Sequence, residues 1–297
     1  MQPPDEQAHA ELVGCHIQAS SAATVPHFEV EGEANSSTVF YQEAPEKRED
    51  TQQVVIFFMG DHVEATEGIV ARLNNADGVI AALRKKFRQA SVMVVKPTSY
   101  SEGCFACYTN FLPTTTRSGE PLGFNPSSLR ALRHLRAVLH TCFGASSAEK
   151  MAVTLLGFSK GGAVLNQLLA EIAHVNDPAM TGADPAEVRA LVHSVHAVHY
   201  LDVGANGRGA YPTDPRVHGS LAALATQQPL RVYFHGTPRQ WEDAGRPWIL
   251  EEKNRSLKLM REARFPAAEH LYFGGEEPSM EMHFRIVDAF ETTLTCS

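Results

Sequence analysis

One segment constrains the fold of this chain more than any other: Met151–Asn166, with the sequence MAVTLLGFSKGGAVLN. It begins with a short apolar run, continues through Gly157-Phe158-Ser159-Lys160-Gly161, and leads into apolar residues at helical spacing: Leu165, Leu168, Leu169 and Ile172. This pattern predicts a buried strand, a tight turn and a helix. Glycines two residues before and after a serine permit the close backbone approach that exposes its hydroxyl. The segment therefore predicts a nucleophile elbow with Ser159 as the nucleophile.

Strand-like and helical patterns alternate along the rest of the chain. Runs typical of strands span residues 27–31, 38–42, 53–59, 91–96, 151–156, 195–201, 230–234 and 269–273. Helical patterns span residues 79–87, 129–139, 186–192, 248–264 and 280–294. Such alternation predicts a mostly parallel sheet with helices on both faces. With the elbow, it predicts an α/β-hydrolase fold, and 297 residues with 43% hydrophobic content fit a single domain over residues 1–297.

Two segments depart from this alternation. Residues 1–50 are polar and acidic, with possible edge strands at 27–31 and 38–42. Residues 98–127 are rich in Thr, Ser, Gly, Pro and Asn, interleaved with aromatic side chains. A loop of this length is usually functional, so we expect a lid or pocket wall at 98–127, the alternative being a surface excursion.

A serine nucleophile needs a base, and in this architecture the chain order is serine, acid, histidine. His283 follows the last predicted strand and shares the apolar face of the closing helix with Ile286 and Val287. His270, in contrast, lies within or at the start of that strand. We expect His283 to be the base, the alternative being a histidine that only fills the core.

Two aspartates qualify as the acid that orients the histidine. Asp202 directly follows the predicted strand 195–201, and Asp243 lies in the loop after the next strand. The carboxyl ends of parallel strands carry the active site in such folds, so both positions are suitable and the choice stays open. For the developing oxyanion, we expect the backbone amides of Lys160 and of Gly60-Asp61 to act as donors.

Composition limits the partners. The net charge is −8 without a basic block, which argues against nucleic acid as a partner, and the longest apolar run is shorter than the roughly 18 residues of a membrane span. Five scattered cysteines, with Cys104 and Cys107 as the one close pair, favour reduced thiols, and we expect neither a metal nor another cofactor. The substrate is expected to be a small acyl compound, and protein partners are not specified by the sequence.

The acidic start bears on location. The first 46 residues contain no Lys or Arg, which is unlike a secretory signal or a mitochondrial presequence. From the residues alone we therefore expect a cytoplasmic protein.

Several motifs resemble an uncharacterised α/β-hydrolase-like family whose human member is mitochondrial and encoded by an open reading frame on chromosome 2. They are FFMGD (57–61), VVKPTSY with CYTNF (94–111), GFSKG with VLNQLL (157–169), YLDVG (200–204), HGTPRQWED with RPWI (235–249) and EEPSMEMHF (276–284). The resemblance implies the same fold, Ser159 and His283 as nucleophile and base, and a mitochondrial location as the alternative. Asp202 and Asp243 both fall within shared motifs. The family's substrate is unknown.

Together these features predict a serine hydrolase that cleaves an ester, a thioester or an amide through a covalent acyl-enzyme. The alternative is a hydrolase fold that binds a ligand or partner without turnover, because fold alone does not fix function.

Overall fold

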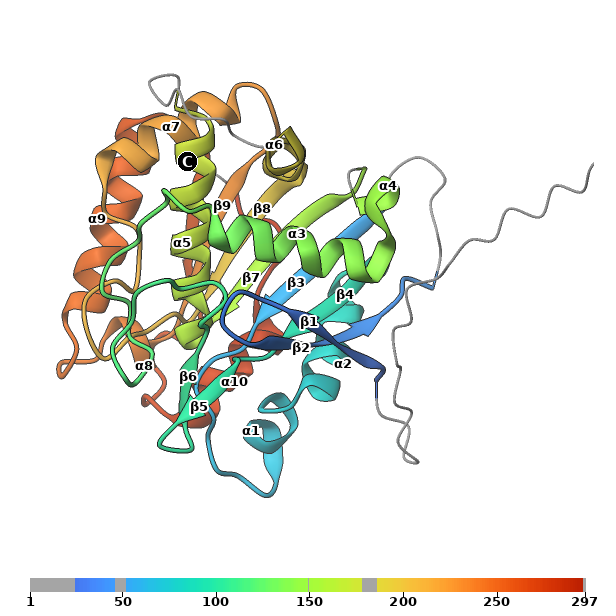
Figure 1. Cartoon of the computed structure of the whole chain (residues 1–297). Helices are drawn as coiled ribbons and strands as arrows, with labels where there is room; N and C mark the ends of the chain where they lie inside the picture. Colours follow the sequence, from blue (N-terminus) through green and yellow to red (C-terminus); the bar gives the residue numbers. More distant parts are fainter. Residues whose placement is uncertain (1–24, 46–51, 149, 178–185, 296–297) are drawn as a thin grey trace, which may run out of the picture.

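The computed structural model describes residues 25–45, 52–148, 150–177 and 186–295 (Figure 1). Within them, an eight-stranded sheet has the order β1-β2-β4-β3-β7-β8-β9-β10. Its strands are β1 (His27–Glu31), β2 (Ser36–Gln42), β3 (Gln53–Phe58), β4 (Ala90–Val95), β7 (Ala152–Phe158), β8 (Val195–Leu201), β9 (Arg231–Gly236) and β10 (Ala267–Leu271). Strand β2 is antiparallel to both of its neighbours, and the pairings from β4 to β10 are parallel. A mostly parallel sheet with a serine turn after its fifth strand is the predicted α/β-hydrolase fold.

Helices cover both faces of this sheet (Figure 1). One face packs against α1 (Gly68–Leu73), α2 (Ala76–Lys86) and α10 (Met280–Ala289). The other face packs against α3 (Arg130–Phe143), α5 (Gly162–Val175), α6 (Ala186–Ser194), α7 (Pro215–Ala225) and α9 (Trp248–Glu262). Alternate residues of β3 point into the two cores: Ile56 and Phe58 into the core under α3 and α5, Val55 and Phe57 into the other.

Several elements differ from the sequence-based expectation. Helices α1 and α7 were not predicted, although Asp214 before Pro215 is a recognisable helix start, and the Asp214 carboxylate accepts a hydrogen bond from the Arg216 amide. Helix α10 ends at Ala289, short of the predicted residue 294, because Phe290 leaves the helical conformation at φ −57° and ψ 145°. The segment 98–127 contains a short hairpin of β5 (Ser99–Ser101) and β6 (Phe105–Cys107).

The remaining short helices are α4 (Ala145–Ala148) and α8 (Pro238–Trp241), the latter directly after β9. Among the described residues, none of the helices combines the length and apolar character that crossing a membrane requires. Residues 1–24 and 46–50, which belong to the polar N-terminal segment, lie outside the described residues, as do Cys15 and Cys296.

Helix α5, which carries the serine turn at its start, is held to α3 by a buried carboxylate. Glu171 accepts hydrogen bonds from the amides of Ala131 (3.1 Å) and Leu132 (2.8 Å) in the first turn of α3. These amides have no partner within their own helix, so the carboxylate fills that role. Burial raises the pKa of Glu171 to about 7, against the lowering effect of these hydrogen bonds.

This raised pKa predicts a pH-dependent stability. The folded protein retains a proton on Glu171 between the ordinary pKa of 4.5 and about 7, where the unfolded chain has released it. Glu171 therefore makes its full contribution to the free energy of unfolding below pH 4.5, and this contribution is lost as the pH rises through about 7. The loss amounts to at most about 3 kcal/mol. Glu171→Gln should remove this dependence, which urea unfolding of both proteins from about pH 5 to about pH 8 would measure. The same pH dependence in both would contradict the assignment.

Candidate active site

The predicted elbow lies where β7 meets α5. Ser159 has a φ of 52°, in the left-handed region that non-glycine residues rarely adopt, and a short 3-10 turn, Ser159–Gly161, leads into the helix. Gly161 packs so closely on the end of β3 that a Cβ there would lie 2.2 Å from the carbonyl oxygen of Phe58. Any side chain at residue 161 would therefore displace the turn that presents the serine.

His283 lies beside this turn. It belongs to α10, whose first turn is capped by the Ser279 hydroxyl accepting from the Met282 amide. The imidazole packs on the ring of Phe158, the residue before Ser159, with ring centroids 4.5 Å apart. Its Nδ1 lies 2.6 Å from Oδ2 of Asp202. The chain thus brings the predicted base and one predicted acid together at the elbow.

Asp202 is fully buried at the carboxyl end of β8. Besides His283, its carboxylate accepts hydrogen bonds from the Thr237 amide (2.7 Å) and the Thr237 hydroxyl (2.8 Å). Its backbone has a φ of 44° and its amide donates to the carbonyl of His235 at 2.7 Å. A buried carboxylate with hydrogen bonds on both oxygens is fixed in orientation and compensated for lost hydration.

Asp243, the other acid candidate, has different partners. Its carboxylate contacts Nε of Arg246 at 2.8 Å and Nη1 of Arg239 at 3.4 Å, and accepts from the Gly245 amide at 2.9 Å. These bonds close the loop after α8. The two aspartates that the sequence left equal therefore have separate surroundings, and it is Asp202 that contacts His283.

The predicted oxyanion turn follows β3 and contacts the serine. A Cβ on Gly60 would lie 2.5 Å from Cβ of Ser159, so the absence of a side chain allows this approach. The turn is fixed on both sides: the Met59 carbonyl accepts from the Tyr108 hydroxyl at 2.7 Å, and Asp61 Oδ1 accepts from the Ala106 amide at 2.7 Å. Segment 98–127 thus supports the backbone next to Ser159.

The buried contacts of the Lys160 side chain are a feature of the candidate site that the sequence reasoning missed. We expected only its backbone amide to matter, yet the side chain is 2% exposed. Its Nζ lies 2.8 Å from Glu120 and 3.3 Å from Asp61, and donates to the carbonyl of Ser118 at 2.9 Å. A lysine in an otherwise apolar segment is a signal for a buried pair, because a buried ammonium needs a partner. Nothing in the sequence identified Glu120 as that partner.

Glu120, which pairs with Lys160, also contacts the loop that follows β8. Its carboxylate also accepts from the backbone amide of Asn206 at 3.1 Å and from the side-chain amide of Asn206 at 3.3 Å. Lys160, the residue after Ser159, is therefore connected through Glu120 to the segment that follows β8.

A chain of buried polar rings runs from β8 through β9 to Tyr272, which directly follows β10. His199 Nδ1 lies 3.1 Å from Nε2 of His235, and His235 Nδ1 lies 3.1 Å from the hydroxyl of Tyr272. Burial lowers the pKa of His199 to about 3 and that of His235 well below its ordinary value, so both rings are neutral. Consequently neither ring places a positive charge in the core. Over the described part of the chain, there is no cluster of three or more His, Cys, Asp or Glu side chains suited to a metal ion.

Comparison with known sequences identifies the family. The family model C2orf69 matches residues 28–147 and 141–265. This chain belongs to the C2orf69 family. The resemblance inferred from its motifs is thereby confirmed.

Curated members of the C2orf69 family include the mitochondrial protein C2orf69 homologue of Danio rerio, 27% identical over 82% of this chain and 74% of that protein. The human mitochondrial protein C2orf69 is 31% identical over 48% of this chain and 35% of its own length, and the Mus musculus homologue is 32% identical over 48% and 37%. The alignments with the two mammalian proteins thus span little more than a third of their length. The relatives' names do not support the cytoplasmic location expected from the residues alone.

Solved structures similar to this C2orf69 family member include the ester-hydrolase EH1AB1 from the metagenome of Lake Arreo, with 15% identity, a TM-score of 0.48, and coverage of 91% of this chain and 82% of that one. Another is the Bacillus cereus carboxylesterase, with 11% identity, a TM-score of 0.42, and coverage of 84% and 92%. The fold assignment rests on the strand order and the serine turn described above.

The buried ion pairs of Lys160 with Glu120 and Asp61 predict that replacing Lys160 strongly lowers the free energy of unfolding. Lys160→Met should destabilise the protein by about 3 kcal/mol, because the Glu120 carboxylate keeps its buried position and loses its cation. The double variant Lys160→Met/Glu120→Gln should recover part of this loss, since the uncompensated charge is gone. Urea unfolding of the wild type, both single variants and the double variant measures the coupling. A single Lys160→Met variant as stable as the wild type would contradict the buried-pair interpretation.

Proposed function

We propose that this chain is a serine hydrolase that cleaves an ester, a thioester or an amide. The observation that carries the proposal is the 2.6 Å contact between Nδ1 of His283 and the buried carboxylate of Asp202, beside a serine on a left-handed turn. A carboxylate at Nδ1 retains the proton on that nitrogen and leaves Nε2 as the basic nitrogen.

The residues then have complementary roles. Ser159 Oγ attacks the acyl carbonyl while His283 takes its proton at Nε2, and Asp202 stabilises the resulting imidazolium. The backbone amides of Lys160 and of Gly60-Asp61 donate to the oxyanion. His283 returns the proton to the leaving group, and a water molecule deprotonated by the same imidazole hydrolyses the acyl-Ser159 ester. These steps need no metal or cofactor.

Asp202, in preference to Asp243, is the acid in this proposal. Supporting it are the contact with His283 and the two hydrogen bonds from Thr237, which fix the carboxylate in the orientation the imidazole requires. The carboxylate of Asp243 is occupied by Arg239 and Arg246, so its role is to hold a loop.

Segment 98–127 forms a wall of the active site in this proposal. Glu120 and the carbonyl of Ser118 bind the ammonium of the residue that follows the nucleophile, and the ring of Phe105 lies 5.0 Å from the same ammonium. If substrate entry displaces this segment, the ammonium of Lys160 loses these contacts. In this proposal, substrate entry therefore changes the surroundings of the Lys160 charge.

We also propose that the protein acts in mitochondria, because its curated relatives are named mitochondrial proteins. Protease protection of the natural protein in isolated mitochondria should show it inside the organelle. Recovery in the cytosolic fraction alone would contradict this location.

Labelling with a fluorophosphonate tests the proposed chemistry without knowledge of the substrate. The purified protein should acquire one label, on Ser159, because only an activated serine reacts with such a probe. Ser159→Ala and His283→Ala should abolish labelling. A folded protein that stays unlabelled would contradict the proposal and favour a hydrolase fold that binds without turnover.

The two aspartates provide a matched pair for the same measurement. Asp202→Asn should slow labelling by about 10⁴-fold, since the amide stabilises the wrong tautomer of His283. Asp243→Asn should label close to the wild-type rate. The opposite order would overturn the assignment of the acid while leaving Ser159 as the nucleophile.

A further inference from the structure

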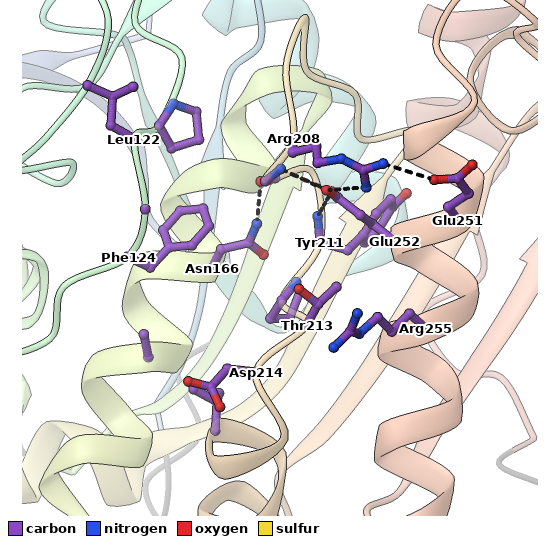
Figure 2. A pocket seen from close by; sticks show the side chains of 16 residues that line it. Leu122, Phe124, Asn166, Arg208, Tyr211, Thr213, Asp214, Glu251, Glu252 and Arg255 are labelled. Carbon is purple, nitrogen blue, oxygen red and sulfur yellow. Dashed lines mark hydrogen bonds and ion pairs between the residues drawn. The ribbon is translucent and has the colours of Figure 1, made fainter.

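A cavity of about 720 Å³ lies along the side of α5 (Figure 2). Its walls are residues 121–124 of segment 98–127, helix α5 at Asn166 and Ala170, the segment 208–214, and helix α9. Its lining includes none of Ser159, Asp202 and His283. Asn166 follows Ser159 by seven residues, which is roughly 10 Å along a helix. The cavity is therefore separate from the proposed catalytic residues.

One wall of the cavity is held in place without any ligand. The Glu252 carboxylate on α9 accepts hydrogen bonds from the amides of Gly209 (3.0 Å) and Ala210 (2.8 Å). The side-chain amide of Asn166 donates to the Gly209 carbonyl at 2.9 Å. These contacts fix segment 208–211 between α5 and α9, so the cavity is preformed, as binding sites usually are.

Apolar and aromatic side chains form the side of the cavity towards segment 98–127. Figure 2 shows Leu122 and Phe124 there, opposite α9. Leu122 is 68% exposed, more than Leu250, Leu271 and Met280, which are 36–39% exposed. This side suits the hydrocarbon part of a ligand.

The opposite side carries one cation without a counter-charge. The carboxylates of the lining are engaged: Glu251 with Arg208 at 3.3 Å, Asp214 with Arg216 at 2.9 Å, and Glu252 with backbone amides. Arg255 lines the cavity from α9, and among the described residues its guanidinium has no hydrogen-bond or ion-pair partner. Figure 2 shows it reaching towards Thr213. A guanidinium in this situation matches an oxyanion with two parallel hydrogen bonds.

We propose that this cavity binds an amphipathic carboxylate, with the carboxylate on Arg255 and the hydrocarbon chain against Leu122 and Phe124. A singly charged group is favoured over a phosphate monoester, because three carboxylates also line the cavity and would repel a second negative charge. The site is independent of the proposed hydrolysis, since it uses none of the catalytic residues.

Calorimetric titration of the purified protein with decanoate, below its micelle concentration, tests this site. Decanoate should bind saturably, and more tightly than decyl phosphate or decanol. Arg255→Gln should weaken binding about tenfold, which corresponds to about 1.4 kcal/mol. Leu122→Ser should also weaken it, because the exposed leucine loses its contact with the chain. Both residues are exposed, so these variants should fold, which circular dichroism would verify.

Arg261→Gln is the matched control, since it removes an arginine of the same helix that does not line the cavity. It should bind decanoate like the wild type, as should Ser159→Ala. Undetectable decanoate binding, unchanged affinity in Arg255→Gln, or equal affinity for decanol or decyl phosphate would overturn the inference. Loss of binding in Ser159→Ala would place the ligand at the serine instead. None of these results bears on fluorophosphonate labelling, so the two proposals fail separately.

Discussion

The structure depends on close backbone packing at the carboxyl end of the sheet, where the turn after β3 meets the turn after β7. Gly60 and Gly161 lack side chains at the points where a Cβ would lie 2.5 Å from Ser159 and 2.2 Å from Phe58. This packing presents Ser159 at a positive φ and aligns the start of α5 behind it. A strained backbone of this kind persists because its surroundings hold it, and such strain is characteristic of functional sites. The loop after β9 and segment 98–127 then pack against this turn, and each is tied to it through a buried charged group.

Two buried charge clusters flank that turn. On one side, Asp202 is compensated by Thr237 and His283, and on the other, Lys160 is compensated by Glu120 and Asp61. Buried charges are tolerated when they are paired and hydrogen-bonded, and removing one partner is costly. Each cluster therefore ties a loop to the elbow: the loop after β9 through Thr237, and segment 98–127 through Glu120. The same contacts that stabilise the fold also position the groups proposed for catalysis.

Local patterns in the sequence predicted the sheet and the elbow well. The runs 27–31 and 195–201 coincide with β1 and β8, because a periodic apolar pattern next to a turn determines a strand locally. The helical spacing of His283, Ile286 and Val287 likewise predicted that His283 lies on the buried face of α10. Which of Asp202 and Asp243 contacts His283 could not be predicted in this way, since it depends on which loop approaches α10 in space. Likewise, the Lys160–Glu120 pair joins residues 40 positions apart in sequence, and no local pattern predicts such a contact.

A crystal structure of the protein after reaction with a phosphonate ester would test the central claim most directly, because it reports both the nucleophile and the oxyanion donors. The account predicts phosphorus bonded to Oγ of Ser159, the phosphoryl oxygen accepting from the backbone amides of Lys160 and Gly60-Asp61, and His283 still bonded to Asp202. Phosphorus on another side chain, or on Ser159 with the phosphoryl oxygen directed away from those amides, would contradict it.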